Sequence, residues 1–332
     1  MESLKVSFKG TDYLGITSNI KFRKFLNEGF ELYGSSFGGS RLSGSFSELF
    51  FKAENLLAQI SGAEAALSFS SGTLAGLALI NNLNTDNELI YAPDTHPALS
   101  SPKQHQVNLS FNEWKHRIYK TYKNSSQNLT ILSNSVNPLN VEKYDFLFLS
   151  EIADNKKITL IVDDSHGFGI LGKNGSGIYK NLPNHKNIEK IVISSLNKAW
   201  AVPGGVVLAS KKIIEQLKKA KLFGGASPII PAYLHAFLQS ERIYQLNRKR
   251  LKNNILLFLN NINNKNIFTY FENFPVFYTD HHEIYDKLLK KGIDISSFNY
   301  PSPTDKRYTR IVITAKHTEK EIIHLCSSLN EL

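Results

Sequence analysis

The amino-acid sequence predicts an α/β fold in which helices cover both faces of a mainly parallel sheet. Short segments that are almost entirely apolar recur through the first two thirds of the chain, and stretches with helical spacing separate them. Parallel strands that are buried on both faces have this pattern. The 332 residues are 42% hydrophobic and 20% charged. This composition is typical of globular proteins and excludes a disordered or fibrous chain.

The strands are expected at intervals along this part of the chain. The segment AALSFS at 65–70 leads directly into an apolar helix over residues 71–83. Further strands are expected at 88–92, 106–111, 129–136, 158–164, 190–195 and 205–210. Because strands alternate with helices, the sequence predicts one large α/β domain.

The pattern changes after Pro228, where a long helix is expected to run towards Leu259. It is followed by the segments 266–271 and 275–279, a helix over 282–291, a strand over 309–315 and a terminal helix over 319–329. This order predicts a smaller α+β domain at the C-terminus. We therefore divide the chain into an N-terminal segment (1–30), a large domain (31–230) and the long helix with the small domain (231–332).

Composition also limits the compartment and the partners. No apolar run approaches the roughly 20 residues of a membrane span, and the first residues lack the apolar stretch of a secretory signal. Cys326 is the only cysteine, so an internal disulfide and a cysteine-based metal cluster are excluded. We expect a cytoplasmic protein that does not associate with membranes.

The formal net charge is +10, from 39 Lys and Arg against 29 Asp and Glu. The densest basic stretch, 211–221, has apolar residues at helical spacing, which indicates the solvated face of a helix. We therefore expect no nucleic-acid partner, although a nucleic-acid-binding module is kept as an alternative. The charge also suits an anionic small molecule.

Four segments place reactive residues at or near predicted strands, and ligands of open α/β sheets lie beyond the carboxyl ends of strands. The first is Ser70-Ser71-Gly72-Thr73, between a strand and a helix. Small residues and the unpaired N–H groups of a new helix suit a phosphate. The alternative is a helix N-cap supplied by Ser71 or Thr73.

The second segment contains Asp163 and His166, after the strand at 158–164. A carboxylate at the end of a buried strand needs a cationic partner, and a protonated pyridine nitrogen would serve, with His166 contacting the same ligand. A metal is ranked lower because no other cluster supplies the missing ligands, so no metal is predicted. A carboxylate that only caps the next turn is the other alternative.

The third and fourth segments contain a lysine and an arginine. Lys198 follows the strand at 190–195 and is a candidate Schiff-base former, with Ser195 able to reach a phosphate. Arg310 enters an apolar strand, where its guanidinium suits a carboxylate ligand. An exposed loop lysine and a structural ion pair are the respective alternatives.

Taken together and in order, these segments resemble fold-type I enzymes that use pyridoxal phosphate, and among them the α-oxoamine synthases. The similar motifs extend from about Tyr13 to the C-terminus. They are DYLGI (12–16), YGSSFGGSRLSGSFSELFFKAENLLAQISG (33–62), SFSSGTLAG (68–76), VDDSHGFGILGKNGSG (162–177) and SSLNKAW (194–200). Their order and spacing are far more specific than any single motif.

The resemblance implies roles for four catalytic residues. Lys198 matches the lysine that binds the cofactor covalently, and Asp163 matches the aspartate that keeps the pyridine nitrogen protonated. His166 matches the histidine near the phenolic oxygen of the cofactor. His96 matches the histidine that stacks on its ring.

The resemblance also implies a set of contacts to the phosphate and to the substrate. Ser71, Gly72, Thr73 and Ser195 match residues around the phosphate. Ser227 matches a threonine that reaches the phosphate from a neighbouring subunit, which implies a homodimer with a shared active site. Arg310 matches the arginine that binds the carboxylate of the substrate amino acid.

The activity implied is the condensation of a small amino acid, such as alanine or glycine, with an acyl thioester of coenzyme A or of an acyl carrier. Two departures from the family pattern bear on the thioester. The chain begins almost directly at DYLGI, without the family's N-terminal helical segment, and the segment 135–139 is contracted. Asn134 also stands where the family has an acid. There are three alternatives to this activity: an aminotransferase, another amino-acid enzyme on this scaffold, or a non-catalytic homologue that binds the cofactor.

Overall fold

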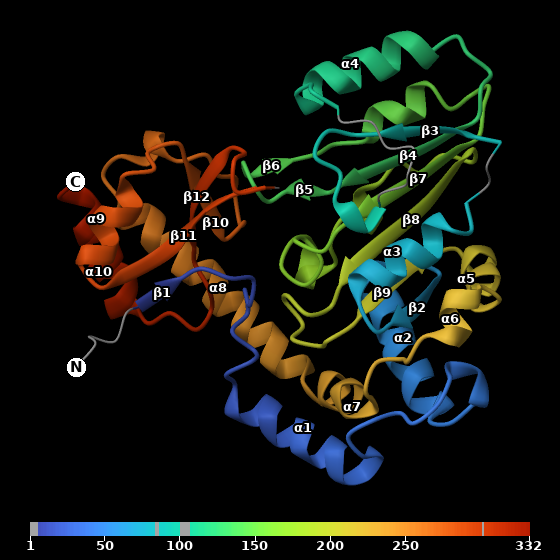
Figure 1. The fold of residues 1–332 in the computed structure, drawn as a ribbon, viewed down its shortest axis with the longest axis horizontal. Helices are drawn as coiled ribbons and strands as arrows, with labels where there is room; N and C mark the ends of the chain where they lie inside the picture. The colour runs from blue at the N-terminus through green and yellow to red at the C-terminus, as the bar shows by residue number, and fades with distance from the viewer. Residues whose placement is uncertain (1–5, 84–85, 100–106, 301) are drawn as a thin grey trace. The chain divides into compact units, whose positions relative to one another are not determined.

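A computed structural model describes residues 6–83, 86–99, 107–300 and 302–332 (Figure 1). The chain groups into two compact units. The larger unit consists of residues 20–136 and 144–241, and the smaller unit consists of residues 6–19, 137–143 and 242–332. The division into domains at 1–30, 31–230 and 231–332, which was made from the sequence, remains a prediction.

A six-stranded sheet forms the centre of the larger unit. Its strands, in spatial order, are β2 (Ala65–Phe69), β9 (Gly205–Ala209), β8 (Ile188–Ser195), β7 (Ile158–Asp163), β4 (Leu129–Asn134) and β3 (Glu88–Tyr91). The pairs β3–β4, β4–β7 and β7–β8 are parallel, whereas β9 is antiparallel to both of its neighbours. The predicted α/β fold with a mainly parallel sheet is therefore confirmed.

Both faces of this sheet are buried, which explains the continuous apolar strands. In β7, Ile161 belongs to the core cluster that includes helix α3, and its neighbours Leu160 and Val162 are also fully buried. The helices of the larger unit are α1 (Ile20–Tyr33), α2 (Ser47–Ser61), α3 (Gly72–Ile80), α4 (Phe111–Tyr122), α5 (Lys211–Lys218), α6 (Lys221–Gly225) and α7 (Pro231–Gln239).

The strand expected at 106–111 is not present at residues 107–111. Gln106 lies outside the described residues. Residues 107–110 have no strand structure, and Phe111 begins α4. Ser110 caps this helix: its side chain accepts from the backbone N–H of Glu113, whose carboxylate accepts from the backbone N–H of Ser110. The apolar Phe111 stacks on Tyr144 with ring centroids 4.0 Å apart. Helix capping and aromatic packing therefore outweigh the local β pattern.

The smaller unit has a four-stranded sheet in the order β1 (Val6–Phe8), β11 (Ile293–Asn299), β12 (Arg307–Val312) and β10 (Val276–Thr279). Helices α8 (Glu241–Asn261), α9 (Ile284–Lys290) and α10 (Glu319–Asn330) complete it, with Glu241 assigned to the larger unit. The N-terminal strand β1 pairs in parallel with β11, so the two ends of the chain share one sheet. A two-stranded ribbon is formed by β5 (Val136–Asn137) and β6 (Glu142–Lys143).

The long helix expected after Pro228 is in fact two helices. α7 ends at Gln239 and α8 begins at Glu241. Between them Ser240 is fully buried and its backbone is not helical (φ −105°, ψ 13°). The helical periodicity continues through this residue, so the break was not visible in the pattern.

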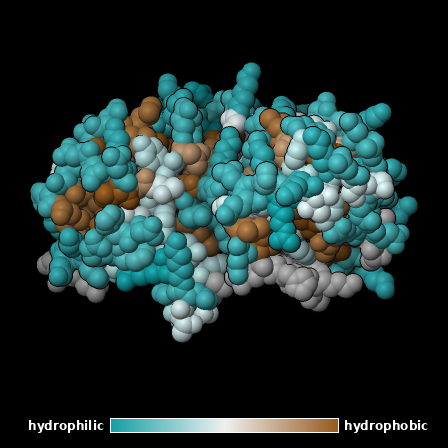
Figure 2. Space-filling view, turned by 90° about the horizontal axis from the view of Figure 1, so that it is seen from above, coloured by the Kyte–Doolittle hydropathy of each residue, from teal (hydrophilic) through white to brown (hydrophobic). Residues whose placement is uncertain are grey.

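The solvated helix face expected for the basic stretch 211–221 is present in α5. Figure 2 shows a face that is mostly hydrophilic, with apolar areas scattered between polar side chains. In α5, Ile214 and Leu217 are buried while Lys211, Lys212 and Lys218 are exposed. Every helix of the described residues is too short or too polar to cross a lipid bilayer.

Candidate active site

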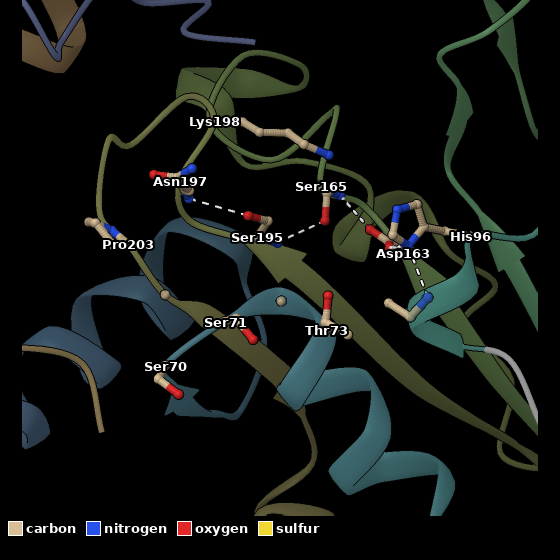
Figure 3. A pocket seen from close by; sticks show the side chains of 13 residues that line it. Ser70, Ser71, Thr73, His96, Asp163, Ser165, Ser195, Asn197, Lys198 and Pro203 are labelled. Atoms are coloured by element: carbon tan, nitrogen blue, oxygen red, sulfur yellow. Dashed lines mark hydrogen bonds and ion pairs between the residues drawn. The ribbon is translucent and has the colours of Figure 1, made fainter. Parts of the chain in front are cut away.

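A cavity of about 360 Å³ opens at the carboxyl ends of the parallel strands of the larger unit (Figure 3). Thirteen residues line it: Ser70, Ser71, Gly72, Thr73, His96, Ala98, Asp163, Ser165, Ser195, Asn197, Lys198, Pro203 and Gly204. The volume is in the range of small-molecule sites. Three of the four predicted segments thus meet in one place.

Asp163 is the last residue of β7 and its side chain is 6% exposed. Its Oδ1 accepts from the backbone N–H of Ser165 at 2.9 Å. Ser165 in turn accepts, through Oγ, from the backbone N–H of Ser195 at 2.7 Å. This chain of bonds fixes the carboxylate against β8. A buried carboxylate held in this way is suited to a cationic ligand group.

Lys198 follows β8, and Figure 3 shows its side chain extending towards Ser165, while Asp163 lies between Ser165 and His96. The Nζ of Lys198 lies 2.8 Å from Nε2 of His166. His166 is not among the residues that line the cavity, but this contact connects it to the lysine. The expected neighbourhood of Lys198, Asp163 and His166 is therefore present.

His96 comes from the loop after β3, and its side chain is 46% exposed. Its Nδ1 accepts from the backbone N–H of Ala98 at 3.1 Å. The same atom lies 3.7 Å from Oδ2 of Asp163, which is too long for a hydrogen bond. Nδ1 is thus used as an acceptor within the loop, and its contact with Asp163 is not a hydrogen bond.

The phosphate-suited segment forms the beginning of α3. Ser71 is the N-cap, and its Oγ accepts from the backbone N–H of Leu74 at 3.0 Å. A Cβ added to Gly72 would lie 3.0 Å from Cβ of Ser195, and one added to Gly205 would lie 2.4 Å from the carbonyl oxygen of Ser71. Both glycines allow the close approach of α3 to β8 and β9. The two alternatives for this segment, N-cap and anion site, are thus compatible, since only the Ser71 hydroxyl is used by the cap.

Arg310 and Ser227 are not among the residues that line the cavity. Arg310 is in β12 of the smaller unit, where an Nη1 hydrogen donates to the carbonyl of Pro138 and the guanidinium lies 5.0 Å from the ring centre of Phe298. Burial lowers the pKa of Arg310, and the nearby Tyr13 opposes this shift. Ser227 is exposed, after α6, and does not line the cavity. The roles predicted for both residues stay predictions.

Several lining residues were not predicted from the sequence. Ser165 is one of them, and it lies between Asp163 and His166 in the motif VDDSHG. Its hydrogen bonds join the end of β7 to the end of β8. Its position in that motif was the available signal. Among the described residues, no group of three or more His, Cys, Asp or Glu side chains could hold a metal ion.

The donor set fits pyridoxal phosphate. Asp163 could hold a protonated ring nitrogen, the amine of Lys198 could bind the aldehyde carbon, and the N-terminus of α3 with Ser195 could hold the phosphate. A Cβ at Gly72 would crowd Ser195 and a Cβ at Gly205 would crowd Ser71, so these glycines let the first turn of α3 lie directly against β8 and β9.

The fold is that of pyridoxal phosphate enzymes of fold type I. Two solved structures show it. The Sphingomonas wittichii serine palmitoyltransferase superimposes with a TM-score of 0.81 at 16% identity, covering 98% of this chain and 86% of that chain. The 8-amino-7-oxononanoate synthase of Francisella tularensis superimposes with a TM-score of 0.75 at 24% identity, covering 98% and 97%.

The chain belongs to the aminotransferase class I and II family, whose model matches residues 48–329. It is thus an enzyme that depends on pyridoxal phosphate. Curated relatives include the 8-amino-7-oxononanoate synthases of Buchnera aphidicola subsp. Baizongia pistaciae and Thermosipho melanesiensis, each 26% identical. The matches cover 98% and 94% of this chain and 88% and 84% of those proteins. This similarity supports an enzyme of the α-oxoamine synthase type.

Proposed function

We propose that the protein condenses a small amino acid, of the alanine or glycine type, with an acyl thioester, as its curated relatives' name, 8-amino-7-oxononanoate synthase, suggests. The observation that carries the proposal is the cavity that brings together Lys198, Asp163 and the N-terminus of α3. In the overall reaction the α-carbon gains the acyl group, the thiol leaves and the carboxylate is lost as carbon dioxide.

Pyridoxal phosphate, when bound, supplies an electron sink for the negative charge that develops at the α-carbon. The protein's own groups then have separate tasks. Asp163 stabilises positive charge on the ring nitrogen, and the buried position of its carboxylate strengthens that interaction. The amine of Lys198 is the group proposed to take the α-proton, with His166 adjacent to it at 2.8 Å. Arg310 is proposed to bind the substrate carboxylate.

The first test is the absorption spectrum of the purified protein with pyridoxal phosphate, before and after addition of L-alanine. We expect a visible band that alanine perturbs, and its absence in Lys198→Ala. Lys190→Ala is the matched control, because Lys190 lies in the same strand region but does not line the cavity. A protein that takes up no cofactor under these conditions would overturn the proposal.

The second substrate is tested by product analysis. An acyl thioester should release thiol and carbon dioxide in equal amounts. Formation of a new amino acid from a keto acid, with no thiol released, would instead identify an aminotransferase. The specific observation that favours this second candidate is the contracted segment at 135–139, a departure from the family pattern that bears on the use of a thioester.

A homodimer is proposed from the match of Ser227 to a residue that acts across subunits. Equilibrium sedimentation should give twice the chain mass. Ser227→Ala should weaken cofactor binding without changing that mass. A monomer that binds the cofactor with full affinity would contradict this part of the proposal.

A further inference from the structure

The loop that carries His96 is tied to the end of β4 by the side chain of Asn134. Oδ1 of Asn134 accepts from the backbone N–H of His96 at 3.0 Å. Nδ2 of the same side chain donates to the carbonyl of Asp94 at 2.7 Å. One carboxamide therefore holds the loop at two points that are two residues apart.

Asn134 is buried at the end of a central strand, so its two hydrogen bonds restrict the position of the loop. Asn134 is 5% exposed and is the last residue of β4, paired in register with Asp163 of β7. Asp94 has a left-handed backbone conformation (φ 51°). This conformation is unusual for a residue other than glycine and is tolerated by aspartate. The bond from Asn134 holds the Asp94 carbonyl in the direction that this conformation gives it.

One accepted and one donated hydrogen bond at residue 134 require a carboxamide side chain. Asparagine offers one acceptor and one donor in fixed directions, whereas an ionised aspartate offers acceptors only. A carboxylate at 134 would face the Asp94 carbonyl oxygen without a hydrogen between them. A leucine of similar size would leave both the His96 N–H and the Asp94 carbonyl without their partner.

The position of the His96 ring depends on this loop more than on packing. Its side chain is 46% exposed, so few neighbours confine it. The contact from the Ala98 N–H to Nδ1 lies within the same loop. Thr95 adds bonds from its hydroxyl to the carbonyls of Ala92 and Leu132, but His96 itself is joined to the sheet by Asn134.

We propose that Asn134 is a positioning residue for His96: it fixes the loop so that the imidazole stands over the cavity next to Asp163. The consequence for the cofactor rests on the proposed function, since it assumes that His96 contacts pyridoxal phosphate. The attachment of the loop to β4 does not depend on that assumption.

The attachment is tested by hydrogen exchange in the cofactor-free protein, followed on a peptide that contains the His96 amide. Asn134→Leu should accelerate exchange of that amide at least about tenfold. Asn134→Asp, which keeps the acceptor, should give a smaller acceleration and serves if the leucine variant does not fold.

Asn254→Leu is the matched control. Asn254 is also a buried asparagine, 8% exposed, and its Nδ2 bonds the carbonyls of Thr314 and His317 in the smaller unit. It should lower overall stability and leave exchange at His96 unchanged. Unchanged exchange in both Asn134 variants, or equal acceleration in the control, would overturn the attachment.

The action through His96 is tested by the dissociation constant of pyridoxal phosphate in a double-mutant cycle. Asn134→Leu should raise that constant about tenfold in the wild-type background and less than about twofold in His96→Ala. Equal effects in both backgrounds would refute the positioning role. A wild-type protein that binds no pyridoxal phosphate would refute the proposed function instead, while the exchange experiment would still decide the attachment.

Discussion

Asp164 shows how much one buried side chain can organise beside the cavity. It is 1% exposed, and its two oxygens accept from the Ser135 hydroxyl and from the backbone N–H of Ile178. A Cβ on Gly167 or Gly177 would lie within 2.2 Å of these oxygens, so the glycines let the loop close around the carboxyl group. The loop that contains His166 is thereby fixed to β7 at both ends.

Burial raises the pKa of Asp164 to about 7, against the opposing effect of its two hydrogen bonds. The value in the unfolded chain is about 3.9. Because the folded protein binds the proton more tightly, this group's contribution to stability is complete below about pH 4. It is lost as the pH rises through about 7.

Asp164→Asn should therefore flatten the pH dependence of stability. We expect the free energy of unfolding of the wild-type, cofactor-free protein to fall between pH 5 and pH 8 more than that of the variant. Urea denaturation at the two pH values measures this difference. Asp145→Asn, whose side chain is 58% exposed, should keep the wild-type slope. An identical slope in Asp164→Asn and wild type would show that the carboxyl does not titrate in this range.

At the scale of elements, α3 owes its position to glycines rather than to apolar contacts alone. Gly76 lies in the middle of this helix and is buried. A Cβ there would lie 2.2 Å from the carbonyl oxygen of Ala98. The helix thus approaches the backbone of residues 97–99 directly, next to His96.

Gly76→Ala should destabilise the protein by about 1–3 kcal/mol through overpacking, although alanine is the better helix former by about 1 kcal/mol. Urea denaturation gives the change in unfolding free energy. Gly225→Ala is the control, because a Cβ at Gly225 would meet nothing within 4 Å. That variant should be neutral or slightly stabilising. Equal stability of Gly76→Ala and wild type would show that the helix can shift away.

At the scale of the whole molecule, the cavity is built within one compact unit. All of its lining residues belong to the larger unit, whereas Arg310 belongs to the smaller unit. Cofactor binding and recognition of the substrate carboxylate are therefore expected to be separable by mutation. A ligand at one hundred times its dissociation constant stabilises a protein by about 2.7 kcal/mol.

We accordingly expect pyridoxal phosphate to stabilise wild type and Arg310→Ala equally, and to stabilise Asp163→Ala much less. Arg310→Ala should instead raise the KM for the amino acid. Thermal unfolding at several cofactor concentrations measures the first effect and steady-state kinetics the second. Loss of cofactor stabilisation in Arg310→Ala would place this arginine in the cofactor site.

The fold class and most of the cavity could be predicted from the amino-acid sequence alone. Continuous apolar strands require a sheet covered on both faces, and Asp163, Lys198 and the Ser71–Thr73 segment lie where those strands end. The position of these residues after strands was enough to predict that they share a site, because the carboxyl ends of parallel strands lie along one edge of the sheet.

The remaining features could not be predicted, since each depends on contacts between residues distant in sequence. Packing of Phe111 on Tyr144 accompanies a helix start where a strand was expected. The parallel pairing of β1 with β11 joins segments almost 290 residues apart, and no local pattern encodes such a partner. The attachment of the His96 loop to Asn134 is of the same kind, because a hydrogen bond across 38 residues depends on how the strands are placed.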